Sequence, residues 1–333
     1  MRLRAIPFLV ITSVILCGCQ GGSPRPIKKH RVVMGTVVEI TVIGRDGERV
    51  AAVIHEAFEE MARIEGLMSW KISDSEVSRI NRWAGVKGVA VSPEVMTVIR
   101  RALAISMASE GYFDISIGTL IDLWGFGEEG GHVPAMDDVK ETLRSVNYRA
   151  IHVNEEASTV MLGNVGMRID LGGIAKGYAV DRAFEVLNSR GYRNAIVNAG
   201  GDMRAGGRKA RGPWVIGIQD PRDRSRLLAT FDAVGISIAT SGDYERYFVV
   251  DGVRHHHLLN PFTGFPAREC RSVTILAEDT LSADGLATAV FVMGPERGIR
   301  FIEAMAGVEG LIVSADGGTI QSNGLKGKMR FPN

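Results

Sequence analysis

The sequence predicts an α+β fold in which packed helices and mixed or antiparallel sheets form a single compact domain. Helical and strand patterns alternate along the chain, but several neighbouring strands are joined by short turns as hairpins. Hairpins favour an α+β fold over a doubly wound parallel one. The interior of the chain contains neither an internal repeat nor a linker. Of the 333 residues, 45% are hydrophobic and 23% are charged, which is ordinary for a globular protein and excludes a disordered or collagen-like chain.

The first residues have the features of a secretory signal. Two arginines precede an apolar run, Ala5–Leu16, that is too short to span a bilayer. The run ends in Leu-Cys-Gly-Cys, which resembles the bacterial lipobox, whose last cysteine, here Cys19, is lipidated. We therefore expect a signal peptide over residues 1–18, a lipidated tether rich in Gly, Ser and Pro over 19–29, and a folded domain over 30–333. A plain signal peptide with a different cleavage point is the alternative.

In the first half of the domain, the residue pattern predicts a β-rich start, three helices and a hairpin. Apolar residues at helical spacing mark the first helix. Ser92 followed by Pro93 is typical of a helix start, and Gly111 is typical of a helix end. In order, the expected elements are strands within 30–43, helices at 49–67, 93–110 and 136–146, and a hairpin of strands 151–153 and 159–162.

In the second half of the domain, the residue pattern predicts more strands than helices. A helix at 176–190 is expected to end at Gly191, and the pair Asp251-Gly252 suits a tight hairpin turn. The remaining expected elements are strands at 195–197, 214–218, 228–231, 236–240, 247–250, 272–277 and 310–314, and helices at 283–293 and 298–305.

Charge and cysteine content limit the classes of function. Lys and Arg total 39 and Asp and Glu total 38, and a net charge of +1 argues against broad electrostatic binding to nucleic acid. Three cysteines are too few for a disulfide scaffold, and after removal of the leader and lipidation of Cys19 only Cys270 would remain. The unusual number is 40 glycines, well above the typical ~7% of a chain. So much glycine predicts many places where the backbone turns tightly or approaches a ligand.

Several glycines lie in short polar segments at expected strand ends or helix starts. One runs from Asp170 to Gly177, where a helix begins, so that free N–H groups and the positive end of the helix dipole favour an anionic ligand. Lys176 adds a positive charge. Neither GxGxxG nor GxxxxGK[ST] occurs in this segment, which argues against a Rossmann or P-loop site. A tight loop without a ligand is the alternative.

Two further segments carry residues that could take part in catalysis or bind a metal. The chain has three adjacent histidines at 255–257, but neighbours on a strand point to opposite faces, which favours one functional histidine over a zinc triad. Asp284 and Thr288 are four residues apart on an expected helix and so share one face. A carboxylate and a hydroxyl are hard oxygen ligands suited to Mg²⁺. A helix-capping Asp with a buried Thr is the alternative.

Taken together, these segments resemble the ApbE family of flavin transferases, from about His30 to the end of the chain. The resemblance implies a T-fold-like domain. It rests on motifs in the family's order, at 34–36, 74–81, 111–118, 123–127, 170–181, 198–202, 241–245, 257–264 and 283–294.

The resemblance implies an enzyme that uses FAD and Mg²⁺ and transfers FMN to a threonine hydroxyl of an acceptor protein, with release of AMP. The implied acceptors are subunits of Na⁺-pumping quinone reductases or related redox complexes, and no nucleic acid is implied. Together with the lipobox, it implies a lipid-anchored protein on the periplasmic face of a bacterial membrane, inner or outer. An FAD pyrophosphatase that gives FMN and AMP, and a non-enzymatic flavin-binding lipoprotein, are the alternatives.

The same resemblance implies roles for individual residues. The metal would be held by Asp284, Thr288 and the backbone carbonyl of Gly173, and His257 would act as the base. The implied cofactor-binding residues are Met34, Trp70, Phe113, Asp114, Ile115, Asp170, Lys176, Asp243, Arg246 and Leu258.

The chain departs from the family's pattern at two places. Trp70 stands in for an aromatic residue that the family has near the position of Lys71. Asn260 occupies a position where the family usually has Asp, and we expect this change to alter a loop hydrogen bond more than the chemistry.

Overall fold

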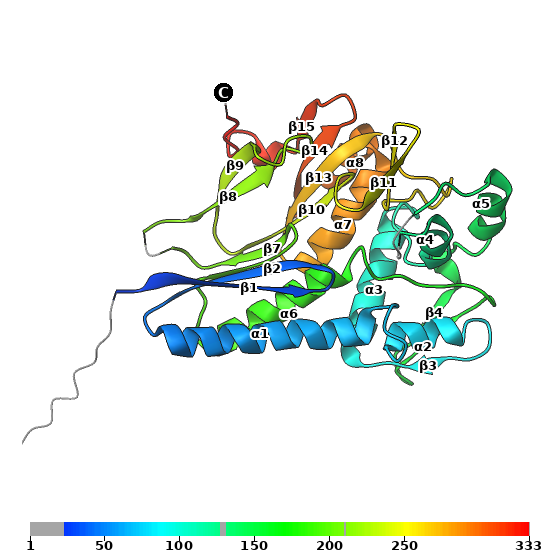
Figure 1. Cartoon of the computed structure of the whole chain (residues 1–333), viewed down its shortest axis with the longest axis horizontal. Coiled ribbons are helices and arrows are strands. Elements are labelled where there is room, and N and C mark those ends of the chain that lie inside the picture. The colour runs from blue at the N-terminus through cyan, green and yellow to red at the C-terminus, as the bar shows by residue number, and fades with distance from the viewer. Residues whose placement is uncertain (1–22, 127–130, 210, 333) are drawn as a thin grey trace, which may run out of the picture.

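The computed structural model describes residues 23–126, 131–209 and 211–332, and an antiparallel sheet of eight strands forms its centre (Figure 1). The strand order is β1-β2-β6-β7-β10-β13-β14-β15, and every neighbouring pair is antiparallel. The bounds are β1 (Arg25–Val33), β2 (Thr36–Gly44), β6 (Ala195–Ala199), β7 (Asp202–Gly206), β10 (Ile236–Gly242), β13 (Cys270–Ala277), β14 (Glu309–Ser314) and β15 (Thr319–Gln321).

The sheet begins earlier in the chain than the sequence indicated. β1 starts at Arg25, and residues 25–29 pair with residues 40–44 of β2, so they belong to the sheet and not to the expected tether. Pairing with β1 satisfies the backbone groups on the outer edge of β2, and the charged, exposed side chains of β1 suit an edge strand. The expected signal peptide and Cys19 lie outside the described residues.

Helices cover one face of this sheet (Figure 1). They are α1 (Gly47–Met68), α3 (Pro93–Ala108), α6 (Ala175–Ser189), α7 (Thr280–Met293) and α8 (Pro295–Glu303). Nearly every side chain of α7 is buried, because this helix is apolar all round and packs against the sheet, α3, α6 and α8. The main hydrophobic core lies between these helices and the sheet.

A hairpin of β8 (Trp214–Gln219) and β9 (Leu227–Ala233) covers the other face of the sheet. Burial alternates strictly along β8, so Trp214, Ile216 and Ile218 point inwards. They join a second core with Leu276 and Leu311 of the main sheet. The sheet therefore lies between a helical layer and a β layer.

Shorter elements complete the end of the molecule that lies to the right in Figure 1. β3 (Val89–Ala90), β5 (Thr159–Leu162) and β4 (Ile151–Asn154) form a small sheet in that order, and β11 (Tyr247–Val250) pairs with β12 (Val253–His256). The other elements are helices α2 (Glu76–Arg82), α4 (Gly118–Trp124) and α5 (Met136–Leu143), and 3-10 turns at Tyr148–Ala150 and, beside β14, at Asn323–Leu325.

The predicted α+β class is confirmed, as are most of the expected elements. The Ser92 hydroxyl accepts a hydrogen bond from the Val95 N–H at the start of α3, and Gly111 follows the helix with a φ of +91°. Asp251 and Gly252 have φ values of +50° and +75° and form the tight turn between β11 and β12. The expected elements did not include α2, α4, β3, β7, β12 or β15, because each is too short to establish a hydrophobic period.

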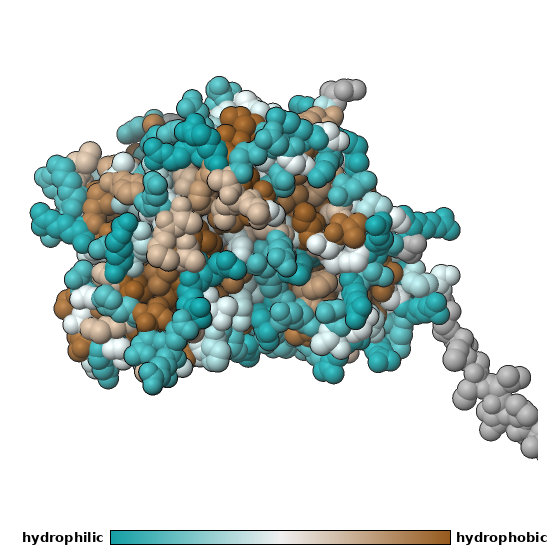
Figure 2. Space-filling model, turned by 180° about the vertical axis from the view of Figure 1, so that it is seen from behind, coloured by the Kyte–Doolittle hydropathy of each residue, from teal (hydrophilic) through white to brown (hydrophobic). Residues whose placement is uncertain are grey.

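The surface and the cysteine content agree with a fold that is held together by its core. Seen from behind, hydrophobic side chains form separate patches between hydrophilic ones (Figure 2). Cys270, the one cysteine among the described residues, is buried and free. No helix in the described ranges is long and apolar enough to cross a membrane.

Candidate active site

A cavity of about 620 Å³ lies where the ends of β2, β6 and β10 meet α6 and α7. Cavities of this size hold small molecules and cofactors. Its walls come from segments that are far apart in the sequence, which are residues 34–36, 65, 68–71, 112–115, 117, 121, 126, 170–173, 175–176, 199–200, 240–242, 245–246, 257–259, 261 and the α7 positions 284 and 288.

Nearly all of the predicted site residues line this cavity. They are Met34, Trp70, Phe113, Asp114, Ile115, Asp170, Gly173, Lys176, Arg246, His257, Leu258, Asp284 and Thr288. Asp243 is the exception among the described residues, and Cys19 lies outside them.

Asp284 is part of a buried charge cluster between α6 and α7. Its Oδ2 accepts a hydrogen bond from the backbone N–H of Gly177 at 2.9 Å, and its Oδ1 lies 3.9 Å from Nζ of Lys176. The Lys176 ammonium also forms an ion pair with Asp202. Burial, together with the negative charge of Asp202, raises the pKa of Asp284 to about 7. Two carboxyl groups thus share one ammonium, and a cation would compensate the excess negative charge when both are ionised.

The electrostatics keep Lys176 charged. Burial by itself lowers the pKa of this amine. The carboxylates of Asp202 and Asp284 outweigh burial and hold the pKa above its ordinary value of 10.5. The cavity therefore contains a permanent positive charge at the first turn of α6, where the helix dipole also favours an anion.

Thr288 lies one turn after Asp284 on α7, and Gly173 approaches the side chain of Thr288. A Cβ on residue 173 would lie 3.3 Å from Oγ1 of Thr288, so glycine permits a close approach of the backbone here. Oγ1 of Thr288 is 3.3 Å from Oγ of Ser241. A carboxylate, hydroxyls and a backbone carbonyl are the hard ligands that Mg²⁺ prefers, so the donor set fits this ion. No group of three or more His, Cys, Asp or Glu side chains in the described part of the chain could hold a metal, so hydroxyl and carbonyl oxygens would have to contribute.

His257 lies on the wall of the cavity with its tautomer set by the backbone. Its Nδ1 is 3.2 Å from the carbonyl oxygen of Arg246, which also accepts from the backbone N–H of His257 at 3.1 Å. A carbonyl can only accept, so Nδ1 carries the proton and Nε2 remains the basic nitrogen. Desolvation, reinforced by the charge of Arg246, lowers the pKa of His257 to about 3. The ring is therefore neutral at neutral pH, which is the form that accepts a proton.

Asp170 and Trp70 line the cavity near Arg246. Oδ1 of Asp170 accepts from the backbone N–H of Gly172 at 2.7 Å and so shapes the glycine turn before α6. Burial raises the pKa of Asp170, whereas Gly172, Arg246 and Trp70 act in the opposite direction. The cations of Lys71 and Arg168 lie 5.6 and 5.5 Å from the Trp70 ring. The aromatic face is thus placed in a positively charged part of the site.

The turn between β1 and β2 brings Met34 into the cavity. Met34 has a φ of +55°, which is uncommon for a residue other than glycine, and Gly35 follows at +67°. Oε2 of Glu65 accepts from the backbone N–H of Met34 at 2.9 Å and holds this conformation. A Cβ on residue 35 would lie 3.5 Å from Nη2 of Arg246, so the turn also borders this cation.

Asp114 shapes the loop before α4. One carboxylate oxygen accepts from the backbone N–H and the hydroxyl of Ser116, at 2.8 and 2.7 Å, and the other accepts from the backbone N–H of Tyr148 at 2.9 Å. Burial raises the pKa of this carboxyl, and these hydrogen bonds oppose the effect. The contribution of Asp114 to the cavity is therefore the position of its neighbours Phe113 and Ile115.

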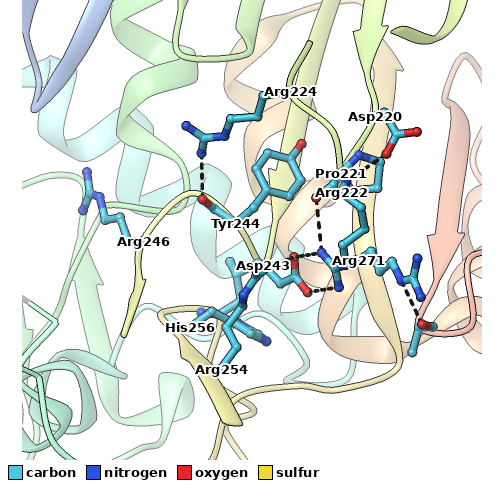
Figure 3. Close-up of polar contacts among 12 residues, drawn as sticks. Asp220, Pro221, Arg222, Arg224, Asp243, Tyr244, Arg246, Arg254, His256 and Arg271 are labelled. Atoms are coloured by element: carbon cyan, nitrogen blue, oxygen red, sulfur yellow. Dashed lines mark hydrogen bonds and ion pairs between the residues drawn. The ribbon is translucent and has the colours of Figure 1, made fainter. Parts of the chain in front are cut away.

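Asp243 is a correction to the predicted site, because its side chain points away from the cavity. Its carboxylate accepts two hydrogen bonds of 2.7 Å from Arg222 and one of 3.2 Å from Arg254 (Figure 3). Ser241 lies within β10 and lines the cavity, whereas β10 ends at Gly242, so Asp243 lies beyond the strand, where its carboxylate turns to the two arginines.

The two histidines before His257 have structural positions. Nε2 of His256 lies 2.7 Å from the carbonyl oxygen of Ala267, and its ring is buried. The His255 ring stacks on Phe248 and packs beside Trp124. Neither lines the cavity, which agrees with one functional histidine in this run.

Three residues that the sequence analysis did not single out contribute to the site. Glu65 holds Met34, Asp202 pairs with Lys176, and Ser241 contacts Thr288. Asp202 and Ser241 lie in motifs that carried the resemblance. Glu65 lies on an amphipathic helix, where a carboxylate is expected on the polar face and gives no signal.

Asn260 shows how the chain tolerates its departure from the family. Its Oδ1 accepts from the backbone N–H of Phe262 at 2.9 Å, and an aspartate oxygen could accept the same bond. The loop that follows His257 therefore keeps its turn with either residue.

Comparisons with known proteins agree on one family. A family model described as the ApbE family matches residues 34–312. An FAD:protein FMN transferase of Treponema pallidum is 34% identical, over 95% of this chain and 93% of the relative. Another, from Vibrio cholerae, is 34% identical over 92% of each chain.

Solved structures give the same result. The crystal structure of the ApbE protein of Thermotoga maritima matches with a TM-score of 0.84 and 39% identity, over 92% of this chain and 100% of that one. The flavin transferase ApbE of Vibrio cholerae matches with a TM-score of 0.80 and 32% identity, over 91% of this chain and 99% of that one.

Proposed function

Because this chain belongs to the ApbE family and is an FAD:protein FMN transferase, we propose that it moves the FMN half of FAD onto a threonine hydroxyl of an acceptor protein and releases AMP. One observation supports this reaction above all others. A cluster of hard oxygen atoms around Asp284 and a histidine with a basic Nε2 line the same cavity.

We propose Mg²⁺ as the metal of the reaction. Asp284, Thr288 and the carbonyl of Gly173 would hold it, since their oxygen atoms suit a hard cation and the buried carboxyl groups exceed the ammonium of Lys176 in number. When bound, the ion offsets the negative charge that grows on phosphate oxygens as the pyrophosphate breaks.

The chain itself supplies the proton acceptor and two fixed cations. Nε2 of His257 takes the proton from the attacking hydroxyl as its oxygen bonds to the phosphorus of the FMN half. The bond from that phosphorus to the bridging oxygen breaks, and AMP leaves with the electron pair. Arg246 attracts the anionic pyrophosphate into the cavity, and the Lys176 ammonium can donate hydrogen bonds that orient it.

We infer that the acceptor belongs to a Na⁺-pumping quinone reductase or a related redox complex. This inference depends on the resemblance of the motifs. It defines the acceptor domains with which the reaction should be tested first.

The test is transfer of mass to such an acceptor domain. The protein is incubated with FAD, Mg²⁺ and the acceptor, and intact-mass spectrometry should show an acceptor that is heavier by one FMN. His257→Asn keeps a donor for the Arg246 carbonyl but removes the base, so transfer should fall by about 100-fold or more while FAD still binds. His55→Asn is the matched control, since His55 is an exposed histidine of α1 outside the cavity.

Each possible result has a defined meaning. Absence of an adduct with every acceptor would contradict the transfer to threonine. Equal rates for His257→Asn and the control would remove the proposed role of this histidine. Release of AMP at the same rate without acceptor as with it would favour the FAD pyrophosphatase.

A further inference from the structure

The β11–β12 hairpin exposes apolar side chains on its outer face and at its turn. Tyr247 and Val249 share the outer face with Arg254 and are 46% and 57% exposed, and Val250 and Val253, which flank the turn, are 38% and 41% exposed. A gathering of large hydrophobic side chains on a surface element is typical of a protein-binding surface.

The inner face of this hairpin is fixed to the body of the molecule. Phe248 and His255 lie opposite each other in the register, with ring centroids 5.4 Å apart. Both pack against the buried Trp124, at 6.3 and 5.6 Å between ring centroids. The aromatic contacts hold the hairpin as a rigid platform, so little ordering would oppose docking on its outer face.

The hairpin is joined directly to the catalytic cavity at both ends. Arg246 precedes β11 and His257 follows β12, and both residues line the cavity. The backbone N–H of His257 donates to the carbonyl of Arg246 at 3.1 Å, which closes the base of the hairpin. A protein that covers the hairpin therefore lies next to two residues of the cavity wall.

Arg222, Arg224 and Arg254 form a positively charged border around Asp243 and Tyr244 (Figure 3). Arg222 and Arg254 share the carboxylate of Asp243, so one positive charge of this trio is not compensated within it. The guanidinium of Arg224 donates to a neutral acceptor, the carbonyl of Tyr244, at 2.8 Å. The Arg254 guanidinium also lies 4.3 Å from the Tyr247 ring and so connects the charged border to the apolar face.

We propose that the outer face of the β11–β12 hairpin is the docking surface for the acceptor protein. The acceptor would cover Tyr247 and Val249 with apolar side chains and place acidic side chains against the arginines. This inference rests on the proposed function, because transfer of FMN to a protein requires a second chain whose hydroxyl reaches His257. The hairpin begins and ends next to cavity residues, so a chain that docks on it lies close to His257.

The test places a charge on the apolar face. Val249→Glu should raise the KM for the acceptor domain at least tenfold, because a carboxylate would be buried against an apolar partner and near acidic groups. The Kd for FAD, measured by flavin fluorescence, should stay within twofold. Val215→Glu is the matched control, because Val215 is 53% exposed on the β8–β9 hairpin, at the other end of the molecule in Figure 1, whereas Val249 is 57% exposed.

The acceptor in this test is a flavin-acceptor domain that the wild-type protein modifies. Normal transfer by Val249→Glu would overturn the docking surface and leave the proposed function intact. Absence of an adduct with wild-type protein would instead overturn the proposed function, and the docking surface with it. Weaker FAD binding by Val249→Glu would mean that the change acts through the cavity, and it would also overturn the proposal.

Ionic strength tests the charged border separately. The KM for the acceptor should rise between 50 and 300 mM NaCl, since salt screens attraction between exposed charges. A KM that does not change with salt would contradict acidic side chains on the acceptor.

Discussion

At the scale of single residues, the site depends on charges that are buried beside one another. Asp284, Lys176 and Asp202 have few ways to satisfy their charges except through each other or a bound ion. Ionised carboxyl groups are costly to bury, which is why the pKa of Asp284 lies at about 7 and not near 3.8. Such a displaced pKa is typical of functional residues.

The raised pKa of Asp284 predicts a pH-dependent affinity for Mg²⁺. The ion requires the carboxylate, and a proton competes with it below pH 7, so the affinity should be about tenfold weaker at pH 6 than at pH 8. Isothermal titration with Mg²⁺ at both pH values measures this change. Asp284→Asn should abolish turnover and lose most of the Mg²⁺ affinity at both pH values, and the exposed Asp138→Asn is the control.

The same group affects stability in the absence of metal. Its pKa is higher in the folded than in the unfolded chain, so its stabilising effect is full below pH 3.8 and is lost as the pH rises through 7. The Tm of metal-free wild type should therefore fall between pH 6 and pH 8 more than that of Asp284→Asn. Identical pH profiles of the two proteins would show that Asp284 already ionises freely.

His257, in contrast to Asp284, should not change its protonation state between pH 6 and pH 8. Its pKa of about 3 leaves it neutral from pH 5 upwards, so this base is not what limits activity at pH 6. Excess Mg²⁺ should therefore restore activity at pH 6, which it could not do if protonation of the histidine were responsible.

At the scale of elements, the close contact of α6 and α7 brings together the residues of the proposed metal site. The backbone N–H of Gly177 reaches Asp284, and Asp181 of α6 accepts from the backbone N–H of Leu281 in the first turn of α7 at 2.9 Å. A Cβ on residue 177 would overlap the carbonyl oxygen of Thr280 and lie 2.8 Å from Cβ of Asp284. Glycine at this position allows the two helices to approach closely enough for Asp284 and Lys176 to meet.

This contact predicts opposite effects of two glycine substitutions. Gly177→Ala should destabilise the protein by about 1–3 kcal/mol, since the helices must separate, and should weaken Mg²⁺ binding as Asp284 moves. Gly66→Ala in α1 meets no atom within 4 Å and should stabilise by about 0.5 kcal/mol through better helix propensity. Urea denaturation of both variants measures the difference, and equal effects would contradict the role of the α6–α7 contact.

At the scale of the whole molecule, the start of the first described strand and the β11–β12 hairpin lie apart. β1 starts on the left of Figure 1, whereas β11 and β12 lie towards the right, and Arg246 and His257 at the ends of that hairpin line the cavity. A tether that enters β1 would therefore leave the mouth of the cavity accessible. This arrangement suits a protein that is anchored at its N-terminus and modifies another protein.

The anchor itself remains a prediction from the lipobox and gives the following test. Cys19→Ala should release the protein from the membrane fraction and remove labelling by radioactive palmitate, because the acyl chains supply the membrane affinity. Transfer to a soluble acceptor should not change, since the catalytic cavity lies in the part of the chain that follows. Membrane association of Cys19→Ala equal to that of wild type would contradict lipidation at this residue.

The sequence predicted which residues line the cavity better than it predicted the directions and partners of their side chains. Lys176, His257 and Asp284 each carry a charge or a basic nitrogen in a glycine-rich or helical pattern, and all three line the cavity. Asp243 carries the same kind of signal and points away, because the side of a strand end on which a side chain lies depends on what packs there. Glu65 gave no signal, because its partner Met34 is 31 residues away.

The sequence by itself determined the α+β class, the main helices and hairpins and the family, because periodicity, capping residues and motifs are local. Only the tertiary structure decided that β1 begins at Arg25, that Asp243 forms ion pairs with Arg222 and Arg254, and that the Lys176 ammonium lies between the carboxyl groups of Asp202 and Asp284. These facts depend on which segments pack together. Packing decides which way a side chain points, and burial raises the free energy of an unpaired charge. The tertiary structure also placed an apolar hairpin between Arg246 and His257, where the sequence indicated only a strand and a turn.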